Sequence, residues 1–204
     1  MSASIRVAAP SDAASVREIY APFCESSAVT FEETPPTEAE MADRIASTLE
    51  TYPWLVCERA GEVAGYAYAG PLRKRRAYQW VVELSVYVAE DARRTGVGEA
   101  LYEALFAVLE RQGVRDAYVV TTLPNPATVG FHERLGFERV VEFPAMGYVE
   151  GEWHDVAWWR RSLGEKPADP EPIRPFPSVR EDDDFEELLA IGERRLEGTS
   201  RGRQ

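Results

Sequence analysis

Residues 86–102 constrain the fold most, because a strand pattern here runs through a basic, glycine-containing turn directly into a helix pattern. Val86 and Val88 alternate as in a half-buried strand. The helix then carries apolar residues at helical spacing, namely Leu101, Leu105, Val108 and Leu109. A second strand pattern follows at 114–123, and a standard crossover through the helix would make the two strands parallel.

The turn between strand and helix, Arg93-Arg94-Thr95-Gly96-Val97-Gly98, has the residue types of an anion site. A helix that begins here directs unpaired backbone N–H groups and the positive end of its dipole at whatever lies in front. The glycines allow close approach to the backbone and the arginines supply charge, as a phosphate or pyrophosphate requires. An ordinary left-handed turn before a helix is the alternative, since a short glycine motif alone is weak evidence.

The rest of the chain alternates strand and helix patterns of similar length. Further strands are expected at 5–9, 54–59, 63–69, 78–88, 137–143 and 153–161. Further helices are expected after Ser11, from Thr37 to about Leu49, and from Asn125 to Leu135. Thr37 and Glu40 fit a capping box, and Gly136 suits a helix end. Residues 26–36 form a loop that holds Val29 and Phe31.

Three segments divide the chain by composition. Residues 1–163 form one α/β domain, residues 164–180 a proline-rich linker, and residues 181–204 an acidic tail. Apolar residues recur at helical spacing in the tail, at Phe185, Leu188, Leu189 and Leu196. They predict an amphipathic helix that docks on the body or on a partner, while a frayed, solvated tail is an equal alternative.

The charge balance bears on partners and compartment. The chain has 35 acidic and 23 basic residues and a net charge of −12, so nucleic acid is not expected as a partner. An acidic surface with only two lysines, Lys74 and Lys166, resembles that of proteins from a salt-rich cytoplasm, although it could serve solubility alone. Cys24 and Cys57 lack metal or redox spacing and indicate buried, reduced thiols. No apolar run reaches ~18 residues and no signal pattern opens the chain, so we expect a cytoplasmic protein without a membrane partner.

Several motifs in this order resemble the GNAT superfamily of acetyl-CoA-dependent N-acetyltransferases. Arg93 to Gly98 matches the superfamily's pyrophosphate motif, Q/R-x-x-G-x-G/A. The chain resembles the phosphinothricin acetyltransferase branch over about residues 5–161, through the stretches 52–56, 61–65, 68–71, 86–88, 123–125 and 153–156. This resemblance implies a mixed, mostly antiparallel sheet with helices on both faces, and a splayed pair of parallel strands that holds the cofactor.

Two residues carry the catalytic roles that the resemblance implies. Amine acetylation needs a neutral amine, whereas an α-amino group with a pKa of about 8 is mostly protonated at neutral pH. Glu83, in the strand before the cofactor turn, is the expected general base, acting directly or through a water. His132 lies where most GNAT enzymes have a tyrosine as general acid, which leaves open whether it protonates the leaving group, relays a proton or positions substrate. His154 lines the pocket or holds the last strand.

Acetyl-CoA is the expected cosubstrate, and no metal is expected. The backbone of Val86, Tyr87 and Val88 would pair with the pantetheine arm, while residues 93–98 would hold the pyrophosphate. Asn125 would hydrogen-bond the cofactor, but it could equally cap its own helix.

The resemblance also implies a small amino-acid substrate with an anionic group, such as phosphinothricin or methionine sulfone or sulfoximine. The expected contacts are Phe31, Arg73, Arg75, Tyr78 and Val156. Arg73 stands where the family has a lysine, and a planar guanidinium differs from a point charge in reach and selectivity. A solvated basic loop that offsets the acidic surface is the alternative for residues 73–76.

Two other functions remain open at this point. The chain could acetylate protein N-termini or lysines, for which an acidic groove would be suited, or it could be a non-catalytic acetyl-CoA sensor whose tail recruits a partner. The resemblance further implies a homodimer.

Overall fold

A computed structural model describes residues 3–25 and 29–201, with side chains to residue 197. Parts of the expected 26–36 loop and of the expected tail, residues 26–28 and 202–204, lie outside the described residues. Within the described residues, seven strands form one sheet in the order β1-β2-β3-β4-β5-β7-β6, and of these neighbours only β4 and β5 are parallel. The strands are β1 (Ala3–Val7), β2 (Trp54–Arg59), β3 (Glu62–Pro71), β4 (Val81–Val88), β5 (Asp116–Leu123), β6 (Glu138–Val149) and β7 (Glu152–Ser162). The expected mixed, mostly antiparallel sheet is confirmed.

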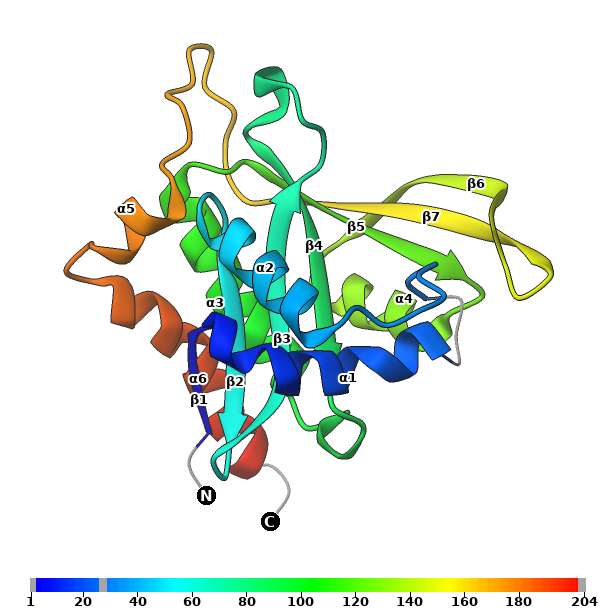
Figure 1. Ribbon diagram of the computed structural model, residues 1–204. Coiled ribbons are helices and arrows are strands. Elements are labelled where there is room, and N and C mark those ends of the chain that lie inside the picture. Colours follow the sequence, from blue (N-terminus) through cyan, green and yellow to red (C-terminus); the bar gives the residue numbers. More distant parts are fainter. Residues whose placement is uncertain (1–2, 26–28, 202–204) are drawn as a thin grey trace.

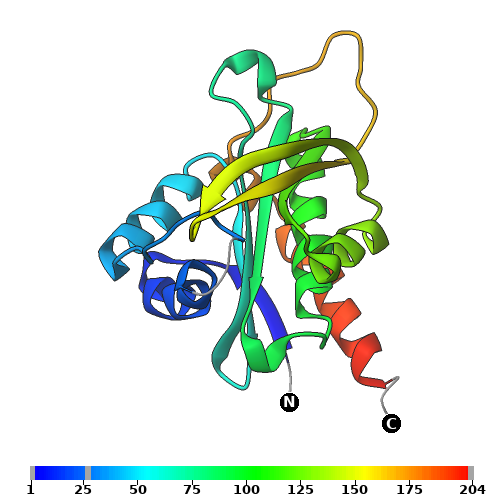
Figure 2. The same ribbon diagram turned by 90° about the vertical axis from the view of Figure 1, so that its right-hand side faces the viewer.

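Helices cover both faces of the sheet, as Figures 1 and 2 show. Helices α1 (Ala13–Glu25) and α2 (Glu38–Leu49) lie on one face. The other face carries α3 (Val97–Gln112), α4 (Pro126–Arg134), α5 (Phe176–Arg180) and α6 (Phe185–Arg201). The β6–β7 hairpin extends beyond the part of the sheet that α1 and α2 cover (Figure 1).

Alternation along the strands divides the apolar residues between two cores. Trp54 and Val56 of β2 pack with α1 and α2, whereas Leu55 and Cys57 pack with α3 on the opposite face. This is the period-two pattern of a strand that is buried on both sides. Cys24 and Cys57 are buried free thiols, as the sequence predicts.

Local signals gave many element ends, but β1 lies at Ala3–Val7 rather than 5–9, β6 continues to Val149 rather than 143, and the starts of α1 and β4 also differ. Thr37 caps α2 and Glu40 accepts the Thr37 N–H at 2.7 Å, so the capping box is confirmed. Ser11 does not cap α1, because the chain enters that helix through a 3-10 turn at Pro10–Asp12, and Asp12 accepts the Ala9 N–H. The strand expected from Tyr78 begins only at Val81, since Arg76–Tyr78 forms another short 3-10 turn.

The parallel pair β4 and β5 is short. Its register runs only from Val81 opposite Asp116 to Glu83 opposite Tyr118. Beyond Glu83, from Leu84 to Val88, β4 pairs with β3 alone among the described residues. The two strands therefore separate at Glu83, as the family resemblance implies.

The chain after β7 is bound tightly to the body. Trp80 donates from its indole nitrogen to the Glu171 carbonyl at 2.8 Å, and the Gln112 side chain donates to the carbonyls of Thr51 and Arg174. Phe176 and Val179 of α5 are buried, so the expected linker contains a short helix.

Helix α6 runs along α3 and buries Phe185, Leu189 and Leu196. This docked helix is the first of the two possibilities that the apolar spacing allowed. The boundaries of the three predicted segments stay predictions. Among the described residues, no helix combines the length and apolarity that a membrane span needs.

Candidate active site

Glu83 lies at the point where β4 and β5 separate, and its side chain is half-buried. Burial raises the pKa of this carboxyl above its ordinary value, and the positive charge of Arg73 partly offsets that rise. Val82 and Leu84, on either side, are buried in the core with α3, so alternation directs Glu83 to the opposite face. The arrangement gives a carboxylate that can accept a proton nearer neutral pH than an exposed glutamate can.

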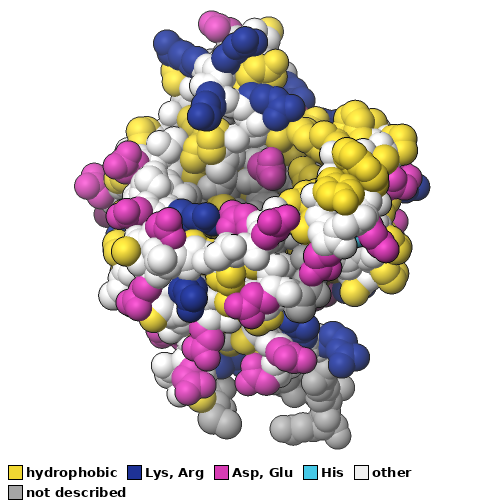
Figure 3. Space-filling model, turned by 45° about the vertical axis from the view of Figure 1, so that its right-hand side comes forward, with side chains coloured by type: hydrophobic (Ala, Val, Ile, Leu, Met, Phe, Trp, Pro, Cys, Tyr) yellow, Lys and Arg dark blue, Asp and Glu magenta, His cyan; other side chains and the backbone are white. Residues whose placement is uncertain are grey.

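The basic loop before β4 stands beside this carboxylate. Arg73 places its guanidinium over the Trp158 ring, 5.4 Å from the centroid, and its charge acts on Glu83. Arg75 is exposed and precedes the 3-10 turn at 76–78, where Tyr78 is 43% exposed. Figure 3 shows a hollow on this side of the molecule, with an acidic side chain within it, basic side chains above and apolar ones beside it.

The turn from Arg93 to Gly98 connects β4 to α3 as expected, after a 3-10 turn at Glu90–Ala92. Gly96 is the N-cap of α3 in the left-handed region, with φ of +91°, which favours glycine. No side chain caps this helix end. Its first backbone N–H groups therefore face forward with the positive end of a 16-residue helix.

Several side chains fix the shape of this turn. Arg59 donates to the Thr95 hydroxyl at 2.8 Å, and Thr95 donates to the Ala92 carbonyl. Arg93 stacks over the Phe23 ring. Close packing also favours glycine at position 98, because a Cβ there would lie 3.3 Å from the Phe131 ring. The sequence did not reveal this contact.

These features fit coenzyme A. The β4 segment after Glu83 has a strand on one side only, and it leads into an uncapped helix N-terminus next to two arginines. Val86 and Val88 are half-buried against the core. The Tyr87 side chain packs against Tyr20 and Phe23 on the other face, so contact from Tyr87 to a cofactor would be through its backbone.

Asn125 caps α4, its side-chain oxygen accepting the Thr128 N–H at 3.1 Å. This is the alternative that the sequence left open, and the cofactor role of Asn125 stays a prediction. Val156 lies in β7, opposite Thr122 of β5, and is only 3% exposed.

His132 is buried in an aromatic cluster rather than open to a pocket. Its Nδ1 lies 3.0 Å from the Thr128 carbonyl, so Nδ1 carries the proton that this acceptor needs. Its Nε2 lies 3.5 Å from the Tyr102 hydroxyl, which can then donate. Burial lowers the pKa of His132 to about 4, more than the hydrogen bond to Thr128 raises it. His132 is therefore a neutral imidazole at neutral pH.

Two residues beside the candidate catalytic groups, Tyr102 and Tyr68, were not identified from the sequence. Tyr102 is a helix residue that meets His132 only through the packing of α3 on α4. Tyr68 lies on β3, and its pKa is raised by burial and by the charge of Glu83. The one available signal was the alternation of Tyr66 and Tyr68 with small residues in β3.

Across the described part of the chain, no three His, Cys, Asp or Glu side chains gather in a way that could hold a metal ion.

Comparison with known proteins gives a consistent result. Residues 5–158 match the family described as "Acetyltransferase (GNAT) domain". The chain is similar to a phosphinothricin N-acetyltransferase of Streptomyces viridochromogenes, with 42% identity over 175 residues that cover 86% of this chain and 95% of the relative. It is 35% identical to an L-methionine sulfoximine/L-methionine sulfone acetyltransferase of Pseudomonas paraeruginosa, over 80% of this chain and 96% of the relative.

A solved structure agrees with these relatives. The phosphinothricin acetyltransferase of Sinorhizobium meliloti, in complex with AcCoA, superimposes with a TM-score of 0.79 at 38% identity. The match covers 86% of this chain and 97% of that one.

Proposed function

The chain belongs to the GNAT acetyltransferase family, and from that premise we propose that it transfers an acetyl group from acetyl-CoA to the α-amino group of a small amino acid. The single observation that carries this is the position of Glu83, a half-buried carboxylate at the separation of β4 and β5. The relatives named for phosphinothricin and for methionine sulfoximine and sulfone support an acceptor of that size. Acetyl-CoA supplies the acetyl group as a reactive thioester.

Glu83 acts as the general base. Its raised pKa matches the task, because a base works best when its pKa lies near the working pH. It takes the proton of the acceptor's ammonium group directly or through a water, which leaves a neutral amine. The amine nitrogen then bonds to the thioester carbonyl carbon as the C–S bond breaks, and the second proton that the nitrogen loses passes to the departing thiolate, which leaves as the free thiol of coenzyme A. Arg73 keeps part of the carboxylate ionised and offers a cation to the anionic end of the acceptor, together with Arg75.

His132 acts as a neutral imidazole that orients a neighbouring hydroxyl group. The proton on Nδ1 is directed to Thr128, and Nε2 is left to accept from Tyr102. We assign His132 a role in orienting the Tyr102 hydroxyl, rather than that of an imidazolium acid. Val86 and Val88 hold the pantetheine arm, while the N–H groups at Gly96 to Gly98, with Arg93 and Arg94, hold the pyrophosphate. Phe31, Tyr78 and Val156 form apolar walls of the acceptor site.

Thiol release from acetyl-CoA, measured with a panel of acceptors, tests this function. Phosphinothricin, methionine sulfone, methionine sulfoximine and the common amino acids are compared with peptides that carry free N-termini. Release with one or more small amino acids, and little with peptides, is expected. Release with peptides only would replace the proposal by protein acetylation, and tight coenzyme binding without any release would indicate a sensor.

We further propose a cytoplasmic homodimer that contacts neither nucleic acid nor membrane. Large apolar side chains gather on the β6–β7 hairpin, where Val140, Met146, Tyr148 and Trp153 are each more than half exposed. Exposed apolar surface of this kind favours contact with another protein. Sedimentation of Trp153→Arg against the parent tests this, and repeating the acceptor panel at low and high salt tests the adaptation to a salt-rich cytoplasm.

A further inference from the structure

One ion pair ties the loop between α1 and α2 to the body of the protein. Arg44 of α2 donates from Nη1 to both carboxylate oxygens of Glu32, at 3.0 and 3.2 Å. The loop folds back at this point, since the Glu32 N–H donates to the Thr30 hydroxyl at 3.1 Å. Farther along, Arg17 of α1 donates to the Pro36 carbonyl. Of these contacts, the pair with Arg44 is the one that joins Glu32, the residue after Phe31, to a helix outside the loop.

Phe31 needs such a contact, because its backbone is in the left-handed region with φ of +55°. An aromatic residue there stores strain that the surroundings must offset. Its ring packs on strand β6 of the hairpin at Gly147, which pairs with His154 of β7. A Cβ at Gly147 would lie 2.2 Å from the Phe31 ring, and the His154 ring is centred 6.2 Å away. Phe31 therefore bridges the loop and the hairpin.

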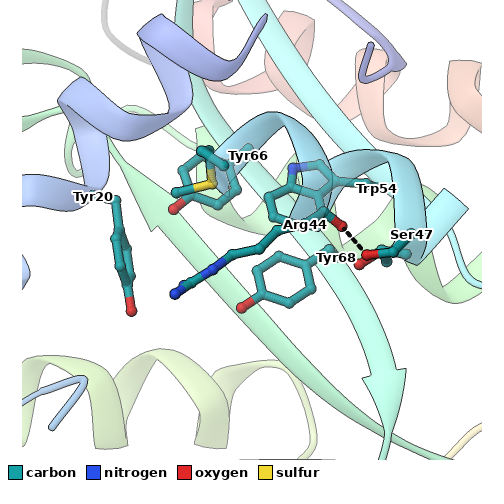
Figure 4. Close-up of a pocket in the computed structure, with 8 residues that line it drawn as sticks. Tyr20, Arg44, Ser47, Trp54, Tyr66 and Tyr68 are labelled. Atoms are coloured by element: carbon teal, nitrogen blue, oxygen red, sulfur yellow. Dashed lines mark hydrogen bonds between the residues drawn. The ribbon is translucent and has the colours of Figure 1, made fainter. Parts of the chain in front are cut away.

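Arg44 of this pair also lines a cavity, which lies on the same face of the sheet as the Glu83 side chain. The cavity has a volume of about 160 Å³ between α1, α2 and the sheet, and Tyr20, Arg44 and Tyr68 are among the residues that line it. Figure 4 shows the Arg44 side chain reaching between Tyr20 and Tyr68. Tyr68 pairs across the strands with Ser85, two residues from Glu83 on the same face. The charges of both Glu83 and Glu32 act on the Tyr68 hydroxyl.

We propose that Arg44 is a positioning residue for the acceptor: through its ion pair with Glu32 it seats Phe31 against Gly147 of β6 and so completes the acceptor side of the site. The proposal rests on the proposed function. The pair is half-exposed, with 44% of the Arg44 side chain and 38% of the Glu32 side chain accessible, and such pairs add little to global stability. Its loss should therefore change acceptor binding and leave folding and coenzyme binding intact.

Steady-state kinetics with phosphinothricin as the acceptor test this role. Glu32→Gln and Arg44→Gln should each raise the acceptor KM by at least about 5-fold, with the acetyl-CoA KM unchanged. The double exchange Glu32→Arg with Arg44→Glu restores an ion pair of opposite direction and should recover the acceptor KM. Asp182→Asn, which removes a carboxylate that two arginines contact elsewhere, is the control and should leave both KM values unchanged.

A second arm displaces the ring without touching the charges. Gly147→Ala places a methyl group where the Phe31 ring lies, and should raise the acceptor KM as the charge variants do. Hydrogen exchange in segments 29–36 and 144–148 reads the same contact without turnover, and both segments should exchange faster in Glu32→Gln.

The possible failures are distinguishable. An unchanged acceptor KM in Glu32→Gln, unchanged exchange in the two segments, or a double exchange that fails to recover the KM would each overturn the positioning role. If none of the tested amino acids causes thiol release by the parent protein, the proposed function is overturned instead. Hydrogen exchange would still test the Arg44 contact in that case.

Discussion

Glu83 is paired with Tyr118 at the last position where β4 and β5 lie side by side. The carboxylate thus stands where the sheet opens, with the strand that would hold the pantetheine arm continuing past it. Glu83→Gln keeps the size of the side chain and removes the proposed base, so it should lower turnover by ~10²–10⁴-fold. Acetyl-CoA affinity, measured by calorimetry, should be preserved. Glu110→Gln removes another glutamate whose pKa burial raises, and should have full activity.

The charge of Arg73 should affect the pH at which the acid limb of the pH–rate profile lies. The base must be ionised, so activity falls as the pH drops through the pKa of Glu83, which burial raises. The charge of Arg73 opposes that rise, and Arg73→Ala should therefore move the acid limb of kcat/KM to higher pH. Arg73→Lys keeps the charge and should leave the limb in place. An unmoved limb in Arg73→Ala would mean that Glu83 does not govern it.

His132 should stay neutral until the solution is strongly acidic. The chain has two histidines, so His154→Gln leaves a single imidazole to follow by NMR. Its resonance should titrate near the pKa of about 4 that burial imposes, rather than near 6.5. Tyr102→Phe removes the hydroxyl that favours an unprotonated Nε2, and should raise that pKa. A His132 titration near 6.5 would contradict the neutral form and would support a role as an imidazolium acid.

Two glycine-to-alanine substitutions should change the free energy of unfolding in opposite directions. Gly192 of α6 packs so closely on α3 that a Cβ would lie 2.2 Å from the Ala100 carbonyl oxygen. Gly192→Ala should therefore lower the free energy of unfolding by about 1–3 kcal/mol. At Gly130 of α4 the nearest atom to a Cβ is an Arg134 nitrogen at 3.6 Å, an ordinary contact. Gly130→Ala should raise stability by about 0.5–1 kcal/mol, and calorimetry measures both.

The junction before α6 should weaken in acid. Hydrogen bonds from Arg174, and secondarily from Arg111, lower the pKa of Asp182 to about 2. A carboxyl with a depressed folded pKa contributes stability that is complete above its unfolded pKa of about 4, and that is lost as the pH falls toward 2. The melting temperature of Asp182→Asn should therefore differ from that of the parent at pH 6 and converge with it near pH 2. A constant difference would contradict this source of stability.

Sequence reasoning succeeded where the signal was local. Thr37 and Glu40 are three residues apart and satisfy each other's backbone, so the start of α2 follows from spacing alone. Gly96 at a helix start likewise marks a left-handed residue that only its immediate neighbours determine. The order of motifs then supplied the family, and the match of residues 5–158 to the GNAT acetyltransferase domain confirms it.

The sequence could not give contacts that depend on how helices pack. Tyr102 meets His132 from 30 positions away, and nothing in either neighbourhood indicates that the imidazole would be buried and neutral. The ion pair between Glu32 and Arg44 joins a loop to a helix, and any of several acidic residues could have made it. Helix α6 showed an apolar stripe, but only the structure identifies α3 and β1 as the surfaces that receive it.

The contact between Glu193 and β1 bears on how copies of this protein can associate. Glu193 of α6 accepts the Ile5 N–H at 2.9 Å, so α6 covers the edge of the first strand at this residue. An exposed edge is a template on which another chain can add a strand. One end of the sheet is thus covered at Ile5, whereas at the other end β6 pairs only with β7 among the described residues, so a further strand would add at β6. When two copies pair through β6, neither has that edge left for a further copy, which favours a closed dimer over an endless filament.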